Sequence, residues 1–225
     1  MSGGLRRFAQ PALQPVAPAV ERCGMCAAEL DERHGHVVEL DRRTISCTCR
    51  ACYLLFTQDG AGRGRYRAVP DRYLHDPAHP LTAADWEVLG IPVATAFFFT
   101  NSDLDRVVAG YPSPGGVTEC ELDLAAWQAL SREHPLLAAP EPDVEAVFVT
   151  DLAAFLVPID ACYALVGRIR LHWRGLSGGD EVRQVLADFV ADLRARSRPV
   201  PAVGRLPGGP QRLDLRSARP PRGVA

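Results

Sequence analysis

The sequence predicts an α+β protein in which a small four-cysteine module precedes an antiparallel sheet with peripheral helices. Three observations lead to this fold class. Two Cys-x-x-Cys pairs lie close together near the N-terminus. Short apolar runs separated by Gly and Pro follow them, as expected of strands in a sheet. Two stretches near the C-terminal end carry apolar residues at helical spacing.

Composition divides the 225 residues into five segments. Residues 1–20 contain three prolines, which break helices, and we expect a flexible leader there. Residues 21–57 hold five of the seven cysteines and form the predicted metal-binding module. Residues 58–81 are a Gly- and Pro-rich linker, and residues 82–197 are the α+β body. Residues 198–225 are rich in Pro, Gly and Arg, and we expect a disordered tail.

The body is predicted to begin with a short helix and to continue as a four-stranded meander. Thr82 and Asp85 have the spacing of a variant capping box, which begins a helix that ends near Gly90. Asp123 can cap a second short helix, placed between the third strand and the fourth. The four predicted strands have the sequences VATAFFFTN, DRVVAGYP, VTECEL and VEAVFVTD.

Two amphipathic helices are predicted to close the body. Their apolar residues recur at intervals of three and four, which places them on one face of each helix. In the first helix these are Ile159, Cys162, Tyr163, Val166, Ile169 and Trp173, and in the second Val182, Val185, Leu186, Phe189 and Leu193. A Gly-Gly pair at residues 178–179 separates the two helices.

Composition and charge exclude several classes of function. All 25 basic residues are arginine, which excludes Schiff-base, P-loop and kinase-type lysine chemistry. Residues 81–175 carry 13 acidic and 5 basic residues and should repel nucleic acid. The hydrolase, dinucleotide, zinc-protease and Walker motifs are absent from the sequence. We therefore expect a protein that does not bind nucleic acid, and a non-enzymatic role is favoured over catalysis.

The N-terminus indicates a cytoplasmic protein. Its two arginines are not followed by the apolar run that a secretory signal requires. No stretch approaches the 18 apolar residues of a membrane span. Disulfides are rare in the reducing cytoplasm, so clustered cysteines there more often hold metal or carry out redox chemistry.

Cys23, Cys26, Cys49 and Cys52 are the predicted metal ligands. Each Cys-x-x-Cys turn points two thiolates the same way, and two such turns supply the four sulfurs of a tetrahedral zinc site. The paired spacing and the predicted hairpin between the pairs favour zinc. Iron or a 2Fe-2S cluster needs the same four cysteines and is the alternative.

Three further side chains near this site are candidate additional ligands. Cys47 lies on the strand that leads to Cys49, and it could replace a ligand, hold a second metal or be a small buried residue. His34 and His36 share one face of a strand, either as a surface pair or with a role beside the metal. The remaining cysteines, at positions 120 and 162, are predicted to be packing residues.

The order of turn, hairpin, second turn and short helix resembles a treble-clef or zinc-ribbon module. The zinc frame of HNH-type endonucleases is similar over about 35 residues. Those enzymes place a histidine close to the second cysteine pair, whereas Tyr53 follows Cys52 here. This departure, together with the acidic body, argues against nuclease activity.

Longer strings between residues 21 and 197 resemble an uncharacterised family of high-GC actinobacteria. The strings are CGMC, CRACYLLF, RYRAVPDRY, IPVATAFFFTN, ECELDLAAW, EPDVEA and PIDACYALVGRIRLHWRG. Members of that family tend to be encoded beside the structural and maturation genes of high-affinity NiFe hydrogenases. The resemblance implies a hydrogenase accessory role and supplies no reaction.

Two functions remain open from the sequence. The first is a zinc-stabilised accessory or adaptor protein that contacts a protein partner, such as a hydrogenase subunit or maturation factor. The second is an electron-transfer or metal-delivery protein that carries iron or a 2Fe-2S cluster on its cysteines.

Overall fold

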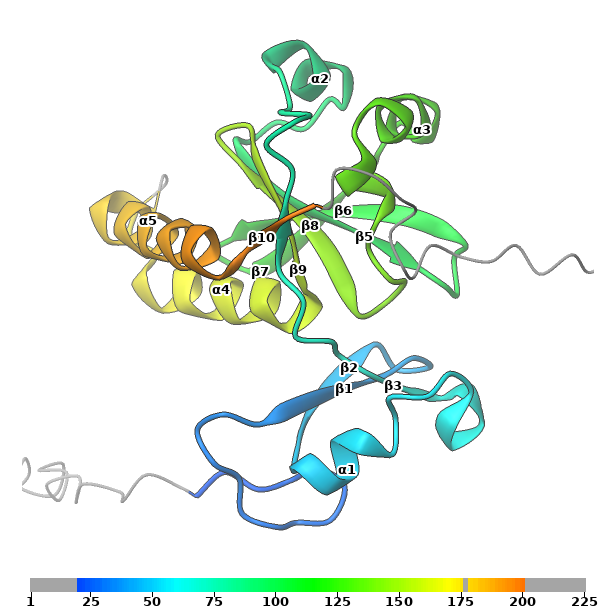
Figure 1. Ribbon diagram of the computed structural model, residues 1–225. Helices are drawn as coiled ribbons and strands as arrows, with labels where there is room; N and C mark the ends of the chain where they lie inside the picture. The colour runs from blue at the N-terminus through cyan, green and yellow to red at the C-terminus, as the bar shows by residue number, and fades with distance from the viewer. Residues whose placement is uncertain (1–19, 176–177, 201–225) are drawn as a thin grey trace, which may run out of the picture.

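The computed structural model describes residues 20–175 and 178–200, which form two sheets with helices around them (Figure 1). The combination of sheets and separate helices confirms the predicted α+β class. The leader predicted for residues 1–20 lies outside the described residues except for its last position. The part of the predicted tail beyond residue 200 lies outside them as well.

A small antiparallel sheet in the lower part of Figure 1 contains the cysteine-rich segment. Its strand order is β2-β1-β3. The strands are β1 (Gly35–Glu39), β2 (Thr44–Thr48) and β3 (Tyr66–Ala68). Strands β1 and β2 form a hairpin in which His36 lies directly opposite Cys47. Helix α1 (Arg50–Leu54) begins two residues after β2 ends.

Among residues 20–175 and 178–200, the large sheet has seven strands in the order β10-β4-β9-β8-β5-β6-β7. The strands are β4 (Leu74–His75), β5 (Thr95–Asn101), β6 (Arg106–Ser113), β7 (Gly116–Cys120), β8 (Glu145–Thr150), β9 (Ala153–Pro158) and β10 (Arg198–Pro199). All neighbouring pairs are antiparallel except β10 and β4, which are parallel.

Within the part of the chain that the structure describes, four helices and one 3-10 turn lie around the large sheet, and a second 3-10 turn lies beside the small one. They are α2 (Ala83–Val88), α3 (Leu124–Glu133), α4 (Ile159–His172), α5 (Gly179–Arg196), η3 (Pro135–Ala138) and η2 (Ala61–Gly64). The predicted capping box of Thr82 and Asp85 is present, and Asp123 caps α3 by accepting two backbone N–H groups. None of the helices among the described residues is both long and apolar enough to cross a membrane.

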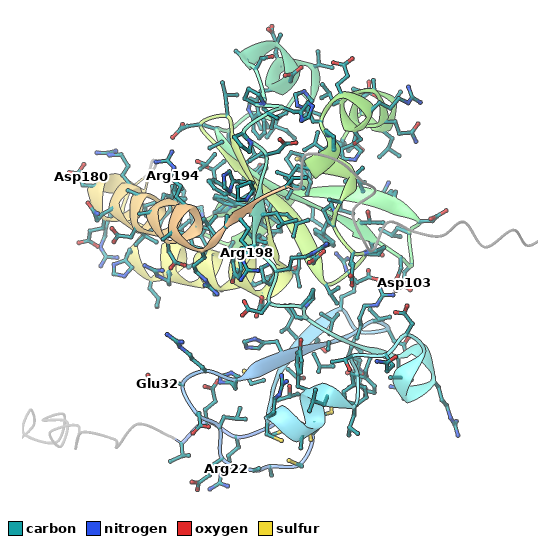
Figure 2. The ribbon with its side chains drawn as sticks, in the orientation of Figure 1. Arg22, Glu32, Asp103, Asp180, Arg194 and Arg198 are labelled. Atoms are coloured by element: carbon teal, nitrogen blue, oxygen red, sulfur yellow. The ribbon has the colours of Figure 1, made fainter. Side chains whose placement is uncertain are left out.

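Both faces of the large sheet carry apolar side chains that are covered by other elements. Successive side chains of a strand point to opposite sides, so one strand contributes to both faces. In β5, Phe97 and Phe99 belong to the cluster that includes the buried residues of α4 and α5. Phe98 belongs to the opposite cluster, where Trp127 of α3 stacks on its ring. Charged side chains such as Asp103 and Asp180 extend from the surface (Figure 2). The core therefore consists of two apolar layers, one on each side of the sheet.

Over the described residues, the predicted four-stranded meander is corrected to a seven-stranded sheet in which the last predicted strand, β8, pairs with β5 rather than with β7. The main omission is β9, which follows β8 after a two-residue turn and continues directly into α4. Asp151 and Leu152 in that turn both have positive φ, 46° and 66°, as a type I′ turn requires. Leu is not the Gly that usually signals such a turn, so the sequence gives no break at this point.

The small sheet packs against the body through a shared core. Val38 of β1 and Val69, which follows β3, belong to the same apolar cluster as Ile159 of α4. The segment predicted as a linker contains β3 and β4, one strand of each sheet. Arg198 and Pro199, placed with the tail by composition, pair with β4 as strand β10. The cysteine-rich segment is therefore fixed to the body by apolar contacts as well as by the chain.

Candidate metal centre

The first cysteine pair lies in a tight turn before β1. The backbone N–H of Cys23 donates to the carbonyl oxygen of Ala28 at 2.8 Å and closes the turn around Cys26. The N–H of Gly24 donates to the carbonyl oxygen of Cys47 at 2.9 Å. This bond attaches the turn to strand β2, which leads to the second cysteine pair.

The second pair lies where β2 gives way to α1. Cys49 is the N-cap residue of α1, and Cys52 lies in its first turn. The N–H of Tyr53 donates to the carbonyl oxygen of Cys49 at 2.9 Å. The strand end is held by Thr48, a buried residue whose hydroxyl donates to the carbonyl oxygen of Gly35 at 3.0 Å.

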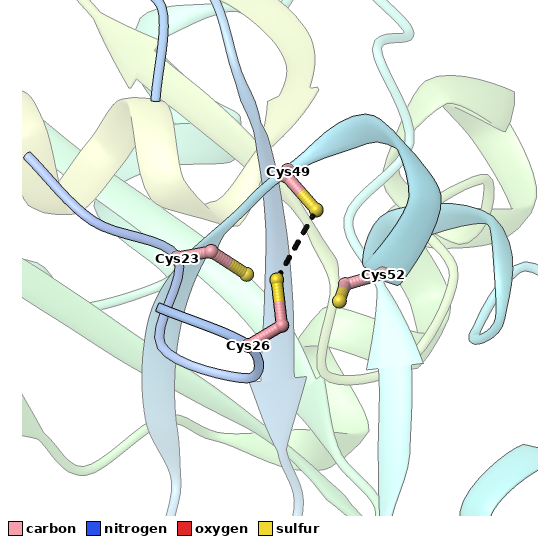
Figure 3. Close-up of side chains that lie close together, drawn as sticks. All are labelled: Cys23, Cys26, Cys49 and Cys52. Carbon is pink, nitrogen blue, oxygen red and sulfur yellow. Dashed lines mark hydrogen bonds between the residues drawn. The ribbon is translucent and has the colours of Figure 1, made fainter. Parts of the chain in front are cut away.

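The four predicted ligands, Cys23, Cys26, Cys49 and Cys52, come together in space (Figure 3). All four Sγ atoms lie within 4.8 Å of one another, and those of Cys26 and Cys49 are 3.7 Å apart. A tetrahedron of sulfurs about 2.3 Å from its centre has edges of about 3.8 Å. All four cysteines are free thiols, so the donor set and its spacing fit a single metal ion that takes sulfur ligands.

The backbone around the cluster favours a thiolate at Cys23. Burial alone would raise the pKa of this thiol, but hydrogen bonds from the backbone N–H groups of Cys49, Cys26 and Met25 outweigh it. Together they lower the pKa of Cys23 from 9.0 to about 6. The thiolate, not the thiol, is the metal ligand, so this arrangement prepares the site for a cation.

The thiols of Cys26 and Cys52 have a raised pKa and therefore hold their protons more tightly than Cys23 does. A hydrogen bond with Cys26, then burial, raises the pKa of Cys52 to about 12. A bound cation would reverse this preference, because a coordinating thiol is deprotonated. Cys23 and Cys52 are buried, whereas Cys26 is exposed, so one side of the cluster faces solvent.

Cys47, His34 and His36, the candidate additional ligands, form a second cluster. Their ligand atoms lie within 4.8 Å of one another, and none of the three belongs to the four-cysteine group. Burial, followed by a hydrogen bond to Glu21, raises the pKa of the Cys47 thiol to about 11. Cys47 and Cys49 therefore belong to different clusters although they are only two residues apart along the chain.

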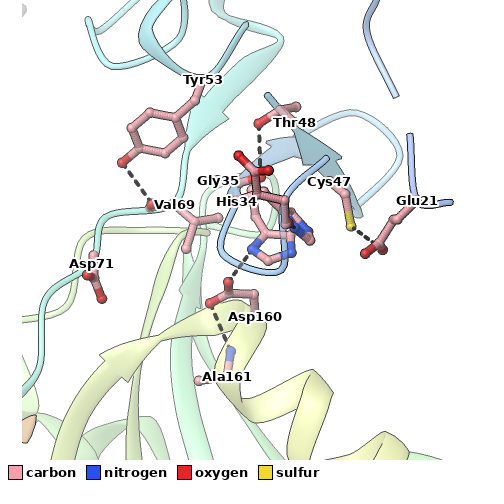
Figure 4. A network of polar contacts seen from close by, with 12 residues as sticks. Glu21, His34, Gly35, Cys47, Thr48, Tyr53, Val69, Asp71, Asp160 and Ala161 are labelled. Carbon is pink, nitrogen blue, oxygen red and sulfur yellow. Dashed lines mark hydrogen bonds and ion pairs between the residues drawn. The ribbon is translucent and has the colours of Figure 1, made fainter. Parts of the chain in front are cut away.

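Two carboxylates lie beside this second cluster, and no local pattern in the sequence predicts that they do. Nδ1 of His36 lies 2.6 Å from Oδ2 of Asp160, which stands at the start of α4. Figure 4 shows Asp160 on one side of the histidine rings and the thiol of Cys47 directed toward Glu21 on the other. Asp160 is far from both histidines along the chain, so only the packing of the small sheet on α4 reveals the contact.

The last two cysteines lie in the body, away from both clusters. Cys162 is fully buried in α4, and burial raises the pKa of its thiol. Cys120, at the end of β7, is partly buried beside the cluster that contains Phe98. Both positions agree with the packing role predicted for them.

Comparison with known protein families places most of the chain in one of them. A model described as a family of unknown function, DUF5947, matches residues 22–197. The matched segment includes the four-cysteine cluster, the cluster of His34, His36 and Cys47, and every strand of both sheets except β10. Comparison with curated proteins and with solved structures finds no match.

Proposed function

The chain belongs to the family of unknown function DUF5947, and we propose that it is a metal-binding accessory or adaptor protein without enzymatic activity. In this proposal Cys23, Cys26, Cys49 and Cys52 hold a structural zinc ion in a treble-clef type of site. The observation that carries the proposal is the spacing of the four sulfurs, which all lie within 4.8 Å of one another. A zinc ion held by four protein ligands has no open position and serves stability rather than catalysis.

The small size of the module also supports a structural ion. Few apolar side chains are buried around the cysteine turns, and the apolar face of the small sheet is used in packing against the body, as Val38 and Val69 show. Small modules with little core of their own commonly depend on a metal or on disulfides. The ion would therefore hold the Cys23 turn against the start of α1.

Zinc is preferred over the iron alternatives because of the close spacing. In a 2Fe-2S cluster the cysteines divide into two pairs on separate irons, so their sulfurs spread farther apart than around one ion. Two Cys-x-x-Cys turns around a hairpin are also typical of zinc. A single iron would have the same four ligands, and its colour distinguishes it from zinc.

The proposed partner is another protein. The resemblance to a family encoded beside NiFe hydrogenase genes makes a hydrogenase subunit or maturation factor the first partner to test, in the cytoplasm. Affinity purification of the tagged chain from its own cells, with an untagged strain as the control, should enrich such a subunit. Enrichment of unrelated proteins alone would contradict the partner while leaving the metal site in place.

Metal analysis of the full chain purified without oxygen tests the site. We expect tightly bound zinc and no visible absorption, because zinc has a filled d shell. A brown or red protein that contains iron would contradict the structural zinc site and favour electron transfer. A protein that binds no metal at its cysteines under these conditions would refute both forms of the proposal.

A further inference from the structure

The second cluster has the composition of a metal site. His36 in β1 and Cys47 in β2 are directly opposed across the hairpin, and His34 lies two residues before His36 on the same face. Side chains two residues apart in an extended chain point the same way. The three ligand atoms lie within 4.8 Å of one another, and ligands arranged tetrahedrally at about 2.0–2.3 Å from an ion are about 3.3–3.8 Å apart. Small side-chain rotations would bring all three onto one ion.

The ring nitrogens of both histidines are arranged as in metal sites. Nδ1 of His36 is 2.6 Å from a carboxylate oxygen of Asp160, and Nδ1 of His34 is 2.9 Å from the carbonyl oxygen of Asp31. An Nδ1–H that donates to such an acceptor leaves Nε2 with a free lone pair. Metal-binding histidines almost always hold their second nitrogen in this way.

One of these free nitrogens is unsatisfied. Nε2 of His34 is buried and has no hydrogen-bond partner among the described residues. A buried polar atom without a partner costs about 1–3 kcal/mol, so a native protein normally supplies one. A cation bound between His34 and Cys47 would supply the missing partner.

We propose that His34, His36 and Cys47 form a second site, for a divalent transition-metal ion, and that Asp160 positions His36 in it. Two imidazoles and one thiolate suit ions of intermediate softness such as zinc, nickel or cobalt. On binding, the S–H bond of Cys47 breaks, a metal–sulfur bond forms, and the proton passes to Glu21. The Glu21 carboxylate already accepts a hydrogen bond from this thiol, with 3.3 Å between Sγ of Cys47 and Oε1 of Glu21.

The surroundings make this site accessible, unlike a closed four-cysteine site. His34, His36 and Asp160 line a cavity of about 1000 Å³, and His36, Asp160 and Cys47 line a second cavity of about 440 Å³. The larger cavity is lined by six carboxylates and three guanidinium groups, so its net charge attracts cations. Three protein ligands leave a coordination position open toward these cavities, which permits exchange of the ion or of a small ligand.

Metal titration of the full chain tests the proposal. The zinc-loaded protein is washed with a mild chelator, and zinc, nickel or cobalt is added in separate calorimetric titrations while zinc release is measured. We expect one further equivalent to bind without loss of the tightly held zinc. A wild-type protein that takes up no further equivalent of any of the three ions would overturn the proposal.

Variants assign the ligands. Cys47→Ser and His36→Ala should each weaken binding of the further equivalent by more than about 100-fold and leave the four-cysteine ion in place. Asp160→Asn should keep the stoichiometry and lower the affinity by about 10–100-fold, as loss of an orienting carboxylate does. Cys120→Ser and His79→Gln, which change a thiol and an imidazole outside the cluster, should bind as wild type. Undiminished binding by Cys47→Ser would refute the ligand set.

Absorption spectroscopy of the wild-type protein tests the same ligand without a variant that could fail to fold. Cobalt bound by Cys47 in the wild-type protein should give thiolate-to-cobalt charge-transfer absorption that grows with the further equivalent. Zinc release must stay at zero during this titration, since cobalt in the four-cysteine site would give a similar band. Binding without that absorption would show that Cys47 is not a ligand and would overturn the proposal.

Discussion

The Sγ atoms of Cys26 and Cys49 lie 3.7 Å apart, although one belongs to the turn before the hairpin and the other to the first residue after it. No disulfide joins them, since both are free thiols. Each lies in a separate Cys-x-x-Cys turn, so the pair brings the two halves of the four-cysteine cluster together. Any ion bound there would therefore join two segments that are also linked by the hydrogen bond from the Gly24 N–H to the carbonyl oxygen of Cys47.

Replacing Cys49 by serine should remove the tightly held metal. A hydroxyl is a much poorer ligand than a thiolate for a soft site, so we expect metal affinity to fall by more than the about 10–100-fold seen when a supporting residue is lost. The module should also lose stability, because binding of a structural metal contributes directly to folding. Metal content and thermal unfolding, compared with those of Cys120→Ser, measure both effects. An unchanged metal content would show that the proposed ligand set is wrong.

The buried carboxylate of Glu145 should be essential for stability. Arg72 donates to it through Nε at 2.8 Å and through Nη2, and the backbone N–H of Glu141 donates to it at 2.8 Å. The residue is 0% exposed, so Arg72→Leu would leave a buried charge without its partner and cost about 3–5 kcal/mol of unfolding free energy. Urea denaturation measures this loss.

An exposed ion pair provides the matched comparison. Arg22 and Glu29 lie 3.1 Å apart with both side chains more than half exposed, so Glu29→Gln should cost less than about 1 kcal/mol. The double variant that combines Arg72→Leu with Glu145→Leu should lose less unfolding free energy than the two single variants lose together, because neither charge is left unpaired. Equal losses of unfolding free energy at the buried and the exposed ion pair would contradict the prediction that burial makes an unpaired charge costly.

Gly35→Ala should destabilise the small sheet. A Cβ at this position would lie 2.4 Å from Cδ2 of Tyr53, whose ring covers β1 and whose hydroxyl donates to the carbonyl oxygen of Val69 at 3.0 Å. Overpacking of this kind costs about 1–3 kcal/mol. Gly167→Ala is the matched control, because its Cβ meets nothing within 4 Å and alanine favours the interior of α4 by about 0.5–1 kcal/mol. The midpoint of thermal unfolding should fall for Gly35→Ala and rise for Gly167→Ala. A rise for both variants would contradict the predicted clash.

The capping box of α2 should lose strength in acid. Hydrogen bonds from the side chain and then the backbone of Thr82 lower the pKa of Asp85 below 3.8, with a smaller contribution from His134, whose Nε2 is 3.4 Å away. A carboxyl whose pKa is lowered by folding stabilises the protein above its ordinary pKa and loses that contribution as the pH falls through the folded value. Asp85→Asn should therefore be less stable than wild type near neutral pH, by about 0.3–1 kcal/mol.

Stability curves against pH check this assignment. The difference between Asp85→Asn and wild type should shrink below pH 4, while Asp103→Asn, which changes an exposed loop residue, should show no such trend. Thr82→Ala removes the other half of the box and should cost about 1 kcal/mol. A constant difference between Asp85→Asn and wild type from neutral to acidic pH would contradict the role of the carboxylate.

Local signals in the sequence predicted much of the body. Short apolar runs predicted β5 and β8, and helical spacing predicted α4 and α5, whose buried faces include Ile169 and Phe189. Elements without a local signal were missed. Strand β9 is joined to β8 by a turn whose second residue is Leu152, and β4 and β10 are two residues long and exist only because they pair with other strands.

The sequence by itself determined which thiols could share a metal ion and which class of fold surrounds them. Cys23, Cys26, Cys49 and Cys52 are recognisable because each pair lies within a single turn, where spacing alone fixes the direction of the side chains. The tertiary structure alone decided that Cys47 faces the histidines, that Asp160 meets His36, and that Arg72 neutralises Glu145. The first contact depends on the register of the β1–β2 hairpin. The other two join segments more than 70 residues apart along the chain, so their geometry is set by tertiary packing that no local pattern records.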